Sequence, residues 1–317
     1  MSPVAGQLNL RQNLLLMIGA ATVTLMLLVA TGSLGVAGIM LNLFIAVPAA
    51  YVHMRSGTVV GVGAVILVVF GSYLFNGLAG IAGYLLQFGM IAILLPSLLR
   101  RGWNWDRAVA VSVAAITLGS ALLIVSYANV EGHSVSTLID TFAKAEVEQA
   151  MALYAASDMK PEQLQELNSA AEQMADYLRY AYPGLVVLIT GFLALLLLWI
   201  LHAVARGNYQ IRGTEFALWK APELLVWPLI AAGFASVFIE GESRQISVNL
   251  LIVLLPIYFL QGLAIVTHFF NRRKIPPFMR GLGYILIAVL NPMPLVITGL
   301  GVFDLWIDFR KPRVKGT

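Results

Sequence analysis

ANVEGHSVSTLIDTFAKAEVEQAMALYAASDMKPEQLQELNSAAEQMADYLRYAY, from Ala128 to Tyr182, is the one long polar interval in an otherwise apolar sequence. Apolar residues recur within it at helical spacing, first from Ile139 to Tyr154 and then from Leu164 to Leu178. Two such stripes predict two amphipathic helices. The second is expected to begin at Pro161, because proline suits the first turn of a helix.

The composition is that of a membrane protein. Apolar residues make up 59% of the 317 residues and charged residues 11%, against roughly 45–50% and about 25% in soluble domains. The net charge is +4, but the bases lie beside apolar segments, where membrane topology explains them, so nucleic-acid binding is not expected. The sequence has no cysteine, which excludes disulfides, thiolate metal sites and thiol catalysis.

Apolar segments long enough to cross a bilayer, about 20 residues each, predict the fold class. We expect an all-α, polytopic transmembrane helix bundle with eight spans. The predicted spans are residues 13–30, 34–53, 57–75, 79–99, 107–127, 183–205, 223–240 and 246–270. A ninth segment is interrupted, because Asn291-Pro292-Met293-Pro294 must break or kink a helix. Two half-helices that return the tail to its starting side and one Pro-kinked span both remain open.

These boundaries predict three parts. Residues 1–128 form an N-terminal bundle of five spans, residues 129–182 an acidic helical region, and residues 183–317 a bundle of three spans with the broken segment and a basic tail. With a cytoplasmic N-terminus, most bases fall on the cytoplasmic side, as topology favours. They are Arg11, Arg55, Arg100, Arg101, Arg107, Arg206, Arg212, Lys220, Arg272, Arg273, Lys274 and Arg280. The acidic region is then extracytoplasmic, and the expected location is a bacterial cytoplasmic (inner) membrane.

Polar side chains inside apolar spans are costly in a bilayer and are therefore candidates for ligand binding. The candidates are Asn42, Gln87, Asn249, Gln261, His268 and Asn291. Gln261 and His268 are seven residues apart and share a helix face, so with Asn249 they could line a cavity. Hydrogen bonds between helices are the alternative.

The tail carries a second group of candidates. Asp304 and Asp308 are spaced i,i+4 on a terminal helix, which is unfavourable for like charges unless bases answer them. Arg310, Lys311 and the loop bases 272–274 are available. The two interpretations are an ion-pair cluster on the cytoplasmic side and a coupling contact to a partner protein.

Sequence signatures of enzymes are missing. His-Glu-x-x-His, P-loop, Gly-x-Ser-x-Gly and dinucleotide motifs do not occur, and the four histidines are scattered singly. We therefore expect a protein that is not an enzyme, with no catalytic residue, no metal site and no cofactor.

Three segments carry a family resemblance: Gly301-Val-Phe-Asp304-Leu-Trp306-Ile-Asp308-Phe-Arg310-Lys, Gln261-Gly262-Leu263 and Trp219-Lys-Ala-Pro222-Glu223. With them the chain resembles the YybS-like family of bacterial membrane proteins. That family is distantly similar to the S components of energy-coupling-factor transporters, which capture vitamins or metal ions and work with an ATPase and a coupling membrane subunit. The chain departs from the S-component pattern of about six helices by its larger number of expected spans and by the acidic insertion.

Two functions from different classes follow. The resemblance implies a solute-binding or transport component, in contact with the lipid bilayer, a coupling membrane subunit and an ATPase. The alternative is a membrane assembly or scaffold protein, in which the acidic extracytoplasmic helices bind a partner or a second copy of the chain.

Overall fold

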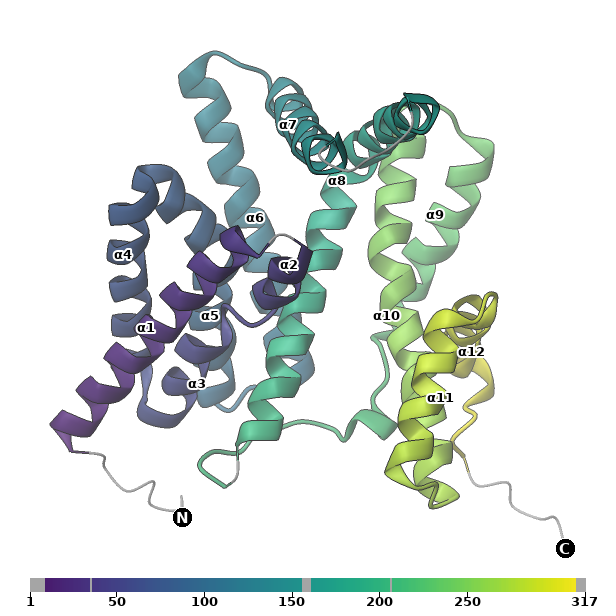
Figure 1. Cartoon of the computed structure of the whole chain (residues 1–317). Coiled ribbons are helices and arrows are strands. Elements are labelled where there is room, and N and C mark those ends of the chain that lie inside the picture. The colour runs from purple at the N-terminus through teal and green to yellow at the C-terminus, as the bar shows by residue number, and fades with distance from the viewer. Residues whose placement is uncertain (1–8, 35, 156–160, 206, 312–317) are drawn as a thin grey trace, which may run out of the picture. The chain divides into compact units, whose positions relative to one another are not determined.

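The computed structural model describes residues 9–34, 36–155, 161–205 and 207–311, and these are helical almost throughout (Figure 1). The helices are α1 (Leu10–Ser33), α2 (Val36–Asn42), α3 (Val47–Ser56), α4 (Thr58–Tyr84), the π-helical η1 (Leu85–Gly89), α5 (Met90–Arg100), α6 (Trp105–Glu131), α7 (Val135–Ala155), α8 (Pro161–Val204), the 3₁₀ turns η2 (Phe216–Leu218) and η3 (Glu223–Leu225), α9 (Val226–Phe238), α10 (Glu242–Arg272), α11 (Pro277–Val289) and α12 (Met293–Ile307).

The chain forms two compact units, and each is built from two separate segments. Unit 1 comprises residues 1–127 and 189–213, and unit 2 comprises residues 128–188 and 214–317. Helix α8 therefore begins in unit 2 and ends in unit 1. The three-part division expected from the sequence groups these segments differently and stays a prediction.

The segment of unit 1 that comprises α4, η1 and α5 forms a hairpin whose turn lies within α4. A straight helix over the 43 residues Thr58–Arg100 would be about 65 Å long, yet both of its ends lie against α3. The Nη1 atom of Arg100 donates to the carbonyl oxygen of Met54 over 2.6 Å, and Gly61 packs against His53. The chain reverses at Gly77, whose φ of 60° and ψ of −147° are not helical. The boundary expected between residues 75 and 79 is this turn.

The described residues contain five helices long and apolar enough to cross a membrane, or six if the bent pair α11 and α12 counts as one span. By length and composition the five are Leu10–Ser33, Thr58–Arg100, Trp105–Val130, Gln173–Val204 and Glu242–Arg272, and the second of them counts once although it folds back at Gly77. The expected count of eight spans and a ninth segment is not confirmed. Residues 34–53 are divided between α2, a turn and α3, and the helix expected at 223–240 is the short α9.

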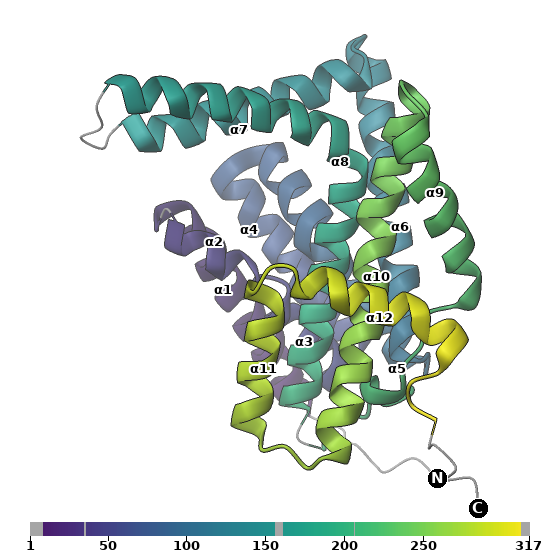
Figure 2. The ribbon, with the colours of Figure 1, turned by 90° about the vertical axis from the view of Figure 1, so that its right-hand side faces the viewer.

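Unit 2 is built around α10, with α9 and α12 packed against it (Figure 2). Two glycines permit the close approach of α10 and α12. A Cβ atom at Gly262 would overlap the carbonyl oxygen of Ile297, and one at Gly301 would overlap the carbonyl oxygen of Tyr258. Larger side chains at either position would push the two helices apart.

The break expected in the last apolar segment is present. Helices α11 and α12 meet at an angle of 101° across residues 290–292 (Figure 2). Met293 and Pro294, which the sequence placed in the break, form the first turn of α12, where a proline costs no hydrogen bond. A broken span and a re-entrant pair both fit this bend.

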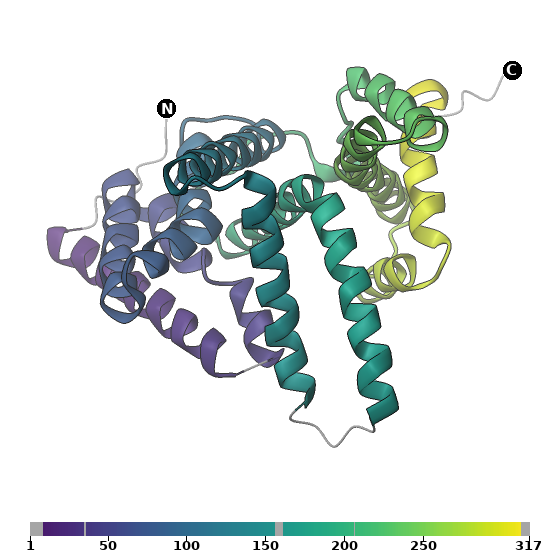
Figure 3. The ribbon, with the colours of Figure 1, turned by 90° about the horizontal axis from the view of Figure 1, so that it is seen from above.

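Helices α7 and α8 confirm the two helices expected in the polar interval, and α8 begins at Pro161 as predicted. The two run side by side (Figure 3), and Arg179 Nε lies 2.5 Å from Asp140 Oδ1. The structure differs from the expectation in one respect, because α8 continues as a single helix into the span expected at 183–205, with Pro183 in its interior. The side chains of Leu164, Leu167 and Ala171 lie outside the described part of the chain. Whether this region is extracytoplasmic stays a prediction.

Candidate functional site

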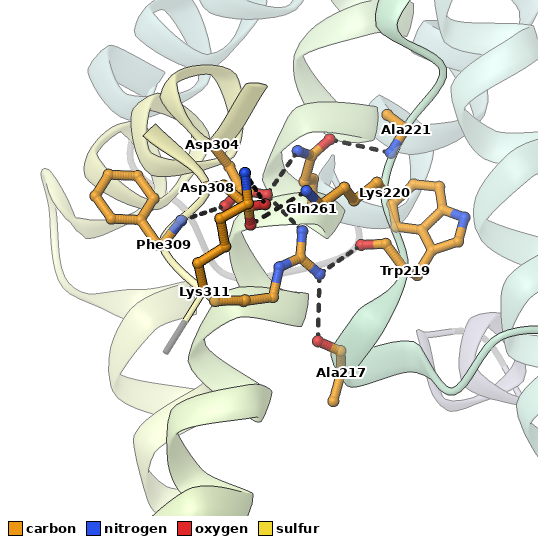
Figure 4. Close-up of polar contacts among 10 residues, drawn as sticks. Ala217, Trp219, Lys220, Ala221, Gln261, Asp304, Asp308, Phe309 and Lys311 are labelled. Atoms are coloured by element: carbon orange, nitrogen blue, oxygen red, sulfur yellow. Dashed lines mark hydrogen bonds and ion pairs between the residues drawn. The ribbon is translucent and has the colours of Figure 1, made fainter. Parts of the chain in front are cut away.

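A buried ion pair lies where α12 ends in unit 2. Asp304, in the last turn of α12, has no exposed surface, and its Oδ2 atom lies 2.5 Å from Nη2 of Arg310 (Figure 4). Its Oδ1 atom accepts a hydrogen bond from the backbone N–H of Phe309 over 3.0 Å. The carboxylate thus holds the chain that follows α12 against the end of its own helix.

Arg310 also connects the tail to the segment that contains η2. Its Nη1 atom donates to the carbonyl oxygens of Ala217 and Trp219, over 3.2 and 2.8 Å (Figure 4). These carbonyls belong to non-helical or 3₁₀ backbone, which leaves oxygens that no helix satisfies. A guanidinium suits this place because its planar group donates in several directions at once.

Gln261 connects α10 to the same cluster. Its Nε2 atom donates to Asp304 Oδ2 over 3.2 Å, and its Oε1 atom accepts from the backbone N–H of Ala221 over 3.0 Å (Figure 4). Gln261 is fully buried. We call Gln261, Asp304 and Arg310, with the backbone of residues 217–221, the buried junction. The three sequence segments that carried the family resemblance meet in it.

The buried junction lies largely inside a region that other proteins share. Residues 20–305 match the model of a family described as "Predicted membrane protein (DUF2232)". The chain belongs to this family. Neither the curated proteins nor the solved structures contain a match to the chain. The matched region of this family member includes Gln261 and Asp304 and stops short of Asp308 and Arg310.

Asp308 lies beside the junction and is less buried. Its carboxylate pairs with Lys220 Nζ at 3.2 Å and with Lys311 Nζ at 3.4 Å (Figure 4). Burial alone would raise the pKa of Asp308, but hydrogen bonds and charge from Lys220, and then from Lys311, outweigh it and lower the pKa below its usual value. Both tail carboxylates of this family member therefore form ion pairs with bases. These bases are Arg310, Lys220 and Lys311 rather than the loop bases 272–274.

Asn249 of α10 bonds to the backbone of α8 near Pro183. Its Oδ1 atom accepts from the N–H of Gly184 over 2.7 Å, and its Nδ2 atom donates to the carbonyl oxygen of Tyr180 over 2.9 Å. In an uninterrupted helix these two backbone groups would bond to each other, four residues apart. The carboxamide of Asn249 thus bonds to both backbone groups of such a pair and ties α10 to α8. A Cβ at Gly184 would meet the backbone of Asn249 at 2.8 Å, so α8 and α10 approach closely here.

The other four candidates do not gather into one site. Asn42 ends α2 and Gln87 is exposed in η1, both in unit 1. His268 is half-buried on α10 with its ring edge-on to Phe269, and Asn291 is exposed at the break before α12. The structure therefore brings together Gln261, Asp304 and Arg310, with Asp308 alongside.

Sequence reasoning missed a hollow of about 460 Å³ in unit 1. It is a broadly open depression, and its walls come from α3 and from the end of α8 with the residues that follow. The lining residues are Val47, Pro48, Tyr51, Arg55, Val204 and Asn208. In the sequence Arg55 is one of the bases that indicate topology, and nothing there places residue 55 beside residue 208.

Proposed function

We propose that this protein is a membrane component that binds a small ligand in the hollow of unit 1 and serves in solute transport, in the way of an S component of an energy-coupling-factor transporter. The hollow is the observation that carries the proposal. Its volume of about 460 Å³ falls in the range of ligand sites, about 300–1,000 Å³. Its lining is mainly apolar with a few polar groups, as is usual for sites that bind small molecules.

The polar residues first considered for ligand binding fit this role less well. Gln261 is fully buried and bonded at both ends of its carboxamide, and Asn249 is occupied by the backbone of α8. A solute could bind either of them only by breaking bonds that hold helices together. The hollow needs no such rearrangement, because Arg55 and Asn208 already line open space.

The proposal is tested by filling the hollow. Val204→Trp adds a large ring at its wall, whereas Ile189→Trp adds the same ring on the same helix at an exposed position. We expect mass spectrometry of the purified wild type and of Ile189→Trp to show the same co-purifying small molecule. The amount of this molecule bound to Val204→Trp should be at least tenfold lower. A wild-type protein that carries no small molecule, or a Val204→Trp variant that retains it in full, would contradict the proposal.

Transport also requires an orientation, and we propose that the N-terminus is cytoplasmic and the membrane a bacterial inner membrane. The distribution of bases described above supports this. A cysteine introduced at Gly316, outside the described residues, should resist a membrane-impermeant thiol reagent in intact cells, whereas one at Gly132 should react. Labelling of both positions would place the tail outside and make the last apolar segment a complete ninth span. A cysteine at Gly132 that resists the reagent would overturn the cytoplasmic N-terminus. A coupling membrane subunit and an ATPase are the partners that the S-component comparison implies.

A second candidate function is assembly through the acidic helices α7 and α8, with a partner or a second copy of the chain. The specific observation is that Met174 and Tyr177 on α8 expose 57% and 71% of their surface, although large apolar side chains outside a membrane favour burial. Met174→Glu should then dissolve a complex seen on native gels, while the neighbouring Gln173→Glu leaves it intact. Identical migration of wild type and Met174→Glu as a single chain would reject assembly.

A further inference from the structure

The hollow of unit 1 changes from apolar to polar along α3. Val47, Pro48, Tyr51 and Arg55 lie within one face of this helix, because their spacing follows the helical repeat. Val47 and Arg55 are eight residues apart, about 12 Å along the helix axis. The hollow therefore has an apolar end near Val47 and Pro48 and a cationic end at Arg55.

The opposite wall adds a polar group after α8. Val204 is the last residue of α8, and Asn208 follows it. The hydroxyl of Tyr209 donates to the carbonyl oxygen of Leu201 over 2.7 Å, which folds this segment back onto the end of α8. Asn208 is thereby held at the hollow, where its carboxamide can donate hydrogen bonds to a ligand.

The cation in the hollow has no carboxylate partner in the described part of the chain. Arg55 donates one hydrogen bond, from Nη1 to the hydroxyl of Tyr51 over 3.1 Å. The nearby Arg100 is used otherwise, since it donates to the carbonyls of His53 and Met54 at the end of α3. Arg55 thus keeps donors for an outside anion.

The charge of unit 1 as a whole favours an anion. By sequence, its two segments contain seven arginines and no lysine, and Asp106 is their only acid. An anion that approaches Arg55 therefore meets a positive field. A neutral or cationic ligand would gain nothing from it.

We propose that the hollow binds an anionic phospholipid, with its phosphate at Arg55 and Asn208 and an acyl chain along Val47, Pro48 and Val204. This inference rests on the proposed function and names the ligand class of the same site. A soluble anion would leave the apolar end in contact with water, and an uncharged lipid would leave Arg55 unpaired. A lipid with a negatively charged head group can pair with Arg55 and cover the apolar end of the hollow with its acyl chain. Membrane proteins bind such head groups in basic pockets between helices.

The experiment uses the full chain in detergent with phosphatidylglycerol and phosphatidylcholine of identical chains, and native mass spectrometry measures the bound ratio. Wild type should prefer phosphatidylglycerol. Arg55→Gln should reduce that preference about fivefold, the change that corresponds to about 1 kcal/mol for one base near a lipid head. Arg55→Lys, which keeps the charge, should retain most of it, and Arg101→Gln, which removes an exposed base of the same unit, should leave it unchanged.

The outcomes separate this inference from the proposed function. Equal preference in Arg55→Gln and Arg101→Gln would overturn the lipid assignment, and so would full displacement of the lipid by glycerol phosphate, which would make the ligand a soluble anion. In either case the proposed function stands if Val204→Trp still abolishes binding of the small molecule that co-purifies with the wild type. If Val204→Trp binds phosphatidylglycerol as well as wild type does, the hollow is not the site and both proposals fail.

Discussion

Replacing Asp304 with leucine is expected to destabilise the protein by about 3–5 kcal/mol, because Arg310 would remain buried without its counter-charge. Only 5% of the Arg310 side chain is exposed, so water cannot replace the carboxylate. The loss should appear as a fall of about 10 °C in the melting temperature of the detergent-solubilised protein. Circular dichroism at 222 nm measures it directly in a helical protein.

The double variant Asp304→Leu with Arg310→Met provides the control. Removing both charges of a buried pair costs far less than removing one, because no unpaired charge is left. Recovery should be partial, since the carbonyls of Ala217 and Trp219 also lose the donor that Arg310 supplies. A single variant as stable as wild type would show that the buried junction does not hold unit 2 together.

Replacing Asn249 with alanine is expected to destabilise the protein by about 2 kcal/mol. The substitution leaves the N–H of Gly184 without the oxygen that accepts from it, at about 1–3 kcal/mol for an unsatisfied buried group. The carbonyl of Tyr180 loses one of its two donors and keeps the one from Gln245. Gln245→Ala is the matched control. It removes one hydrogen bond to the same Tyr180 carbonyl and keeps Asn249 in place, so it should cost about 1 kcal/mol or less.

A double-mutant cycle with Pro183→Ala tests the reason for that cost. Without the proline ring, α8 can straighten, and Gly184 can then bond to Tyr180 directly. Asn249→Ala should therefore cost clearly less in the Pro183→Ala background than in wild type, by thermal unfolding of all four proteins. Strict additivity of the two substitutions would mean that Asn249 stabilises α8 in some other way.

Local signals in the sequence predicted the parts of the fold that depend on local chemistry. Pro161 marked the start of α8 correctly, because its missing N–H has no role in a first turn. The prolines after Asn291 predicted the break before α12. Hydropathy identified α1, α6 and α10, since each is a single long apolar helix.

Long-range contacts were beyond the sequence for a physical reason. A polar side chain in an apolar segment needs a hydrogen-bond partner, but the sequence of the segment does not indicate whether that partner is a solute or another part of the protein. For Gln261 the partners are Asp304 and the backbone of Ala221, 43 and 40 residues away. The hollow was hidden for the same reason, because α3 and Asn208 are far apart along the chain. The expected span at 34–53 failed because hydropathy measures apolar length and is blind to the turn after α2.

The passage of α8 from one unit to the other has a consequence for biosynthesis. Ala194, Leu197 and Leu201, on the late part of α8, belong to the same hydrophobic core as α1, α3, α4 and α5. Between those early helices and this late part, the ribosome must make the 61 residues from Ala128 to Leu188, which takes about 3–12 s at typical rates of translation. During this time the early helices are in the membrane while their hydrophobic core is still incomplete. A membrane chaperone that protects incompletely folded helix bundles would act in this interval.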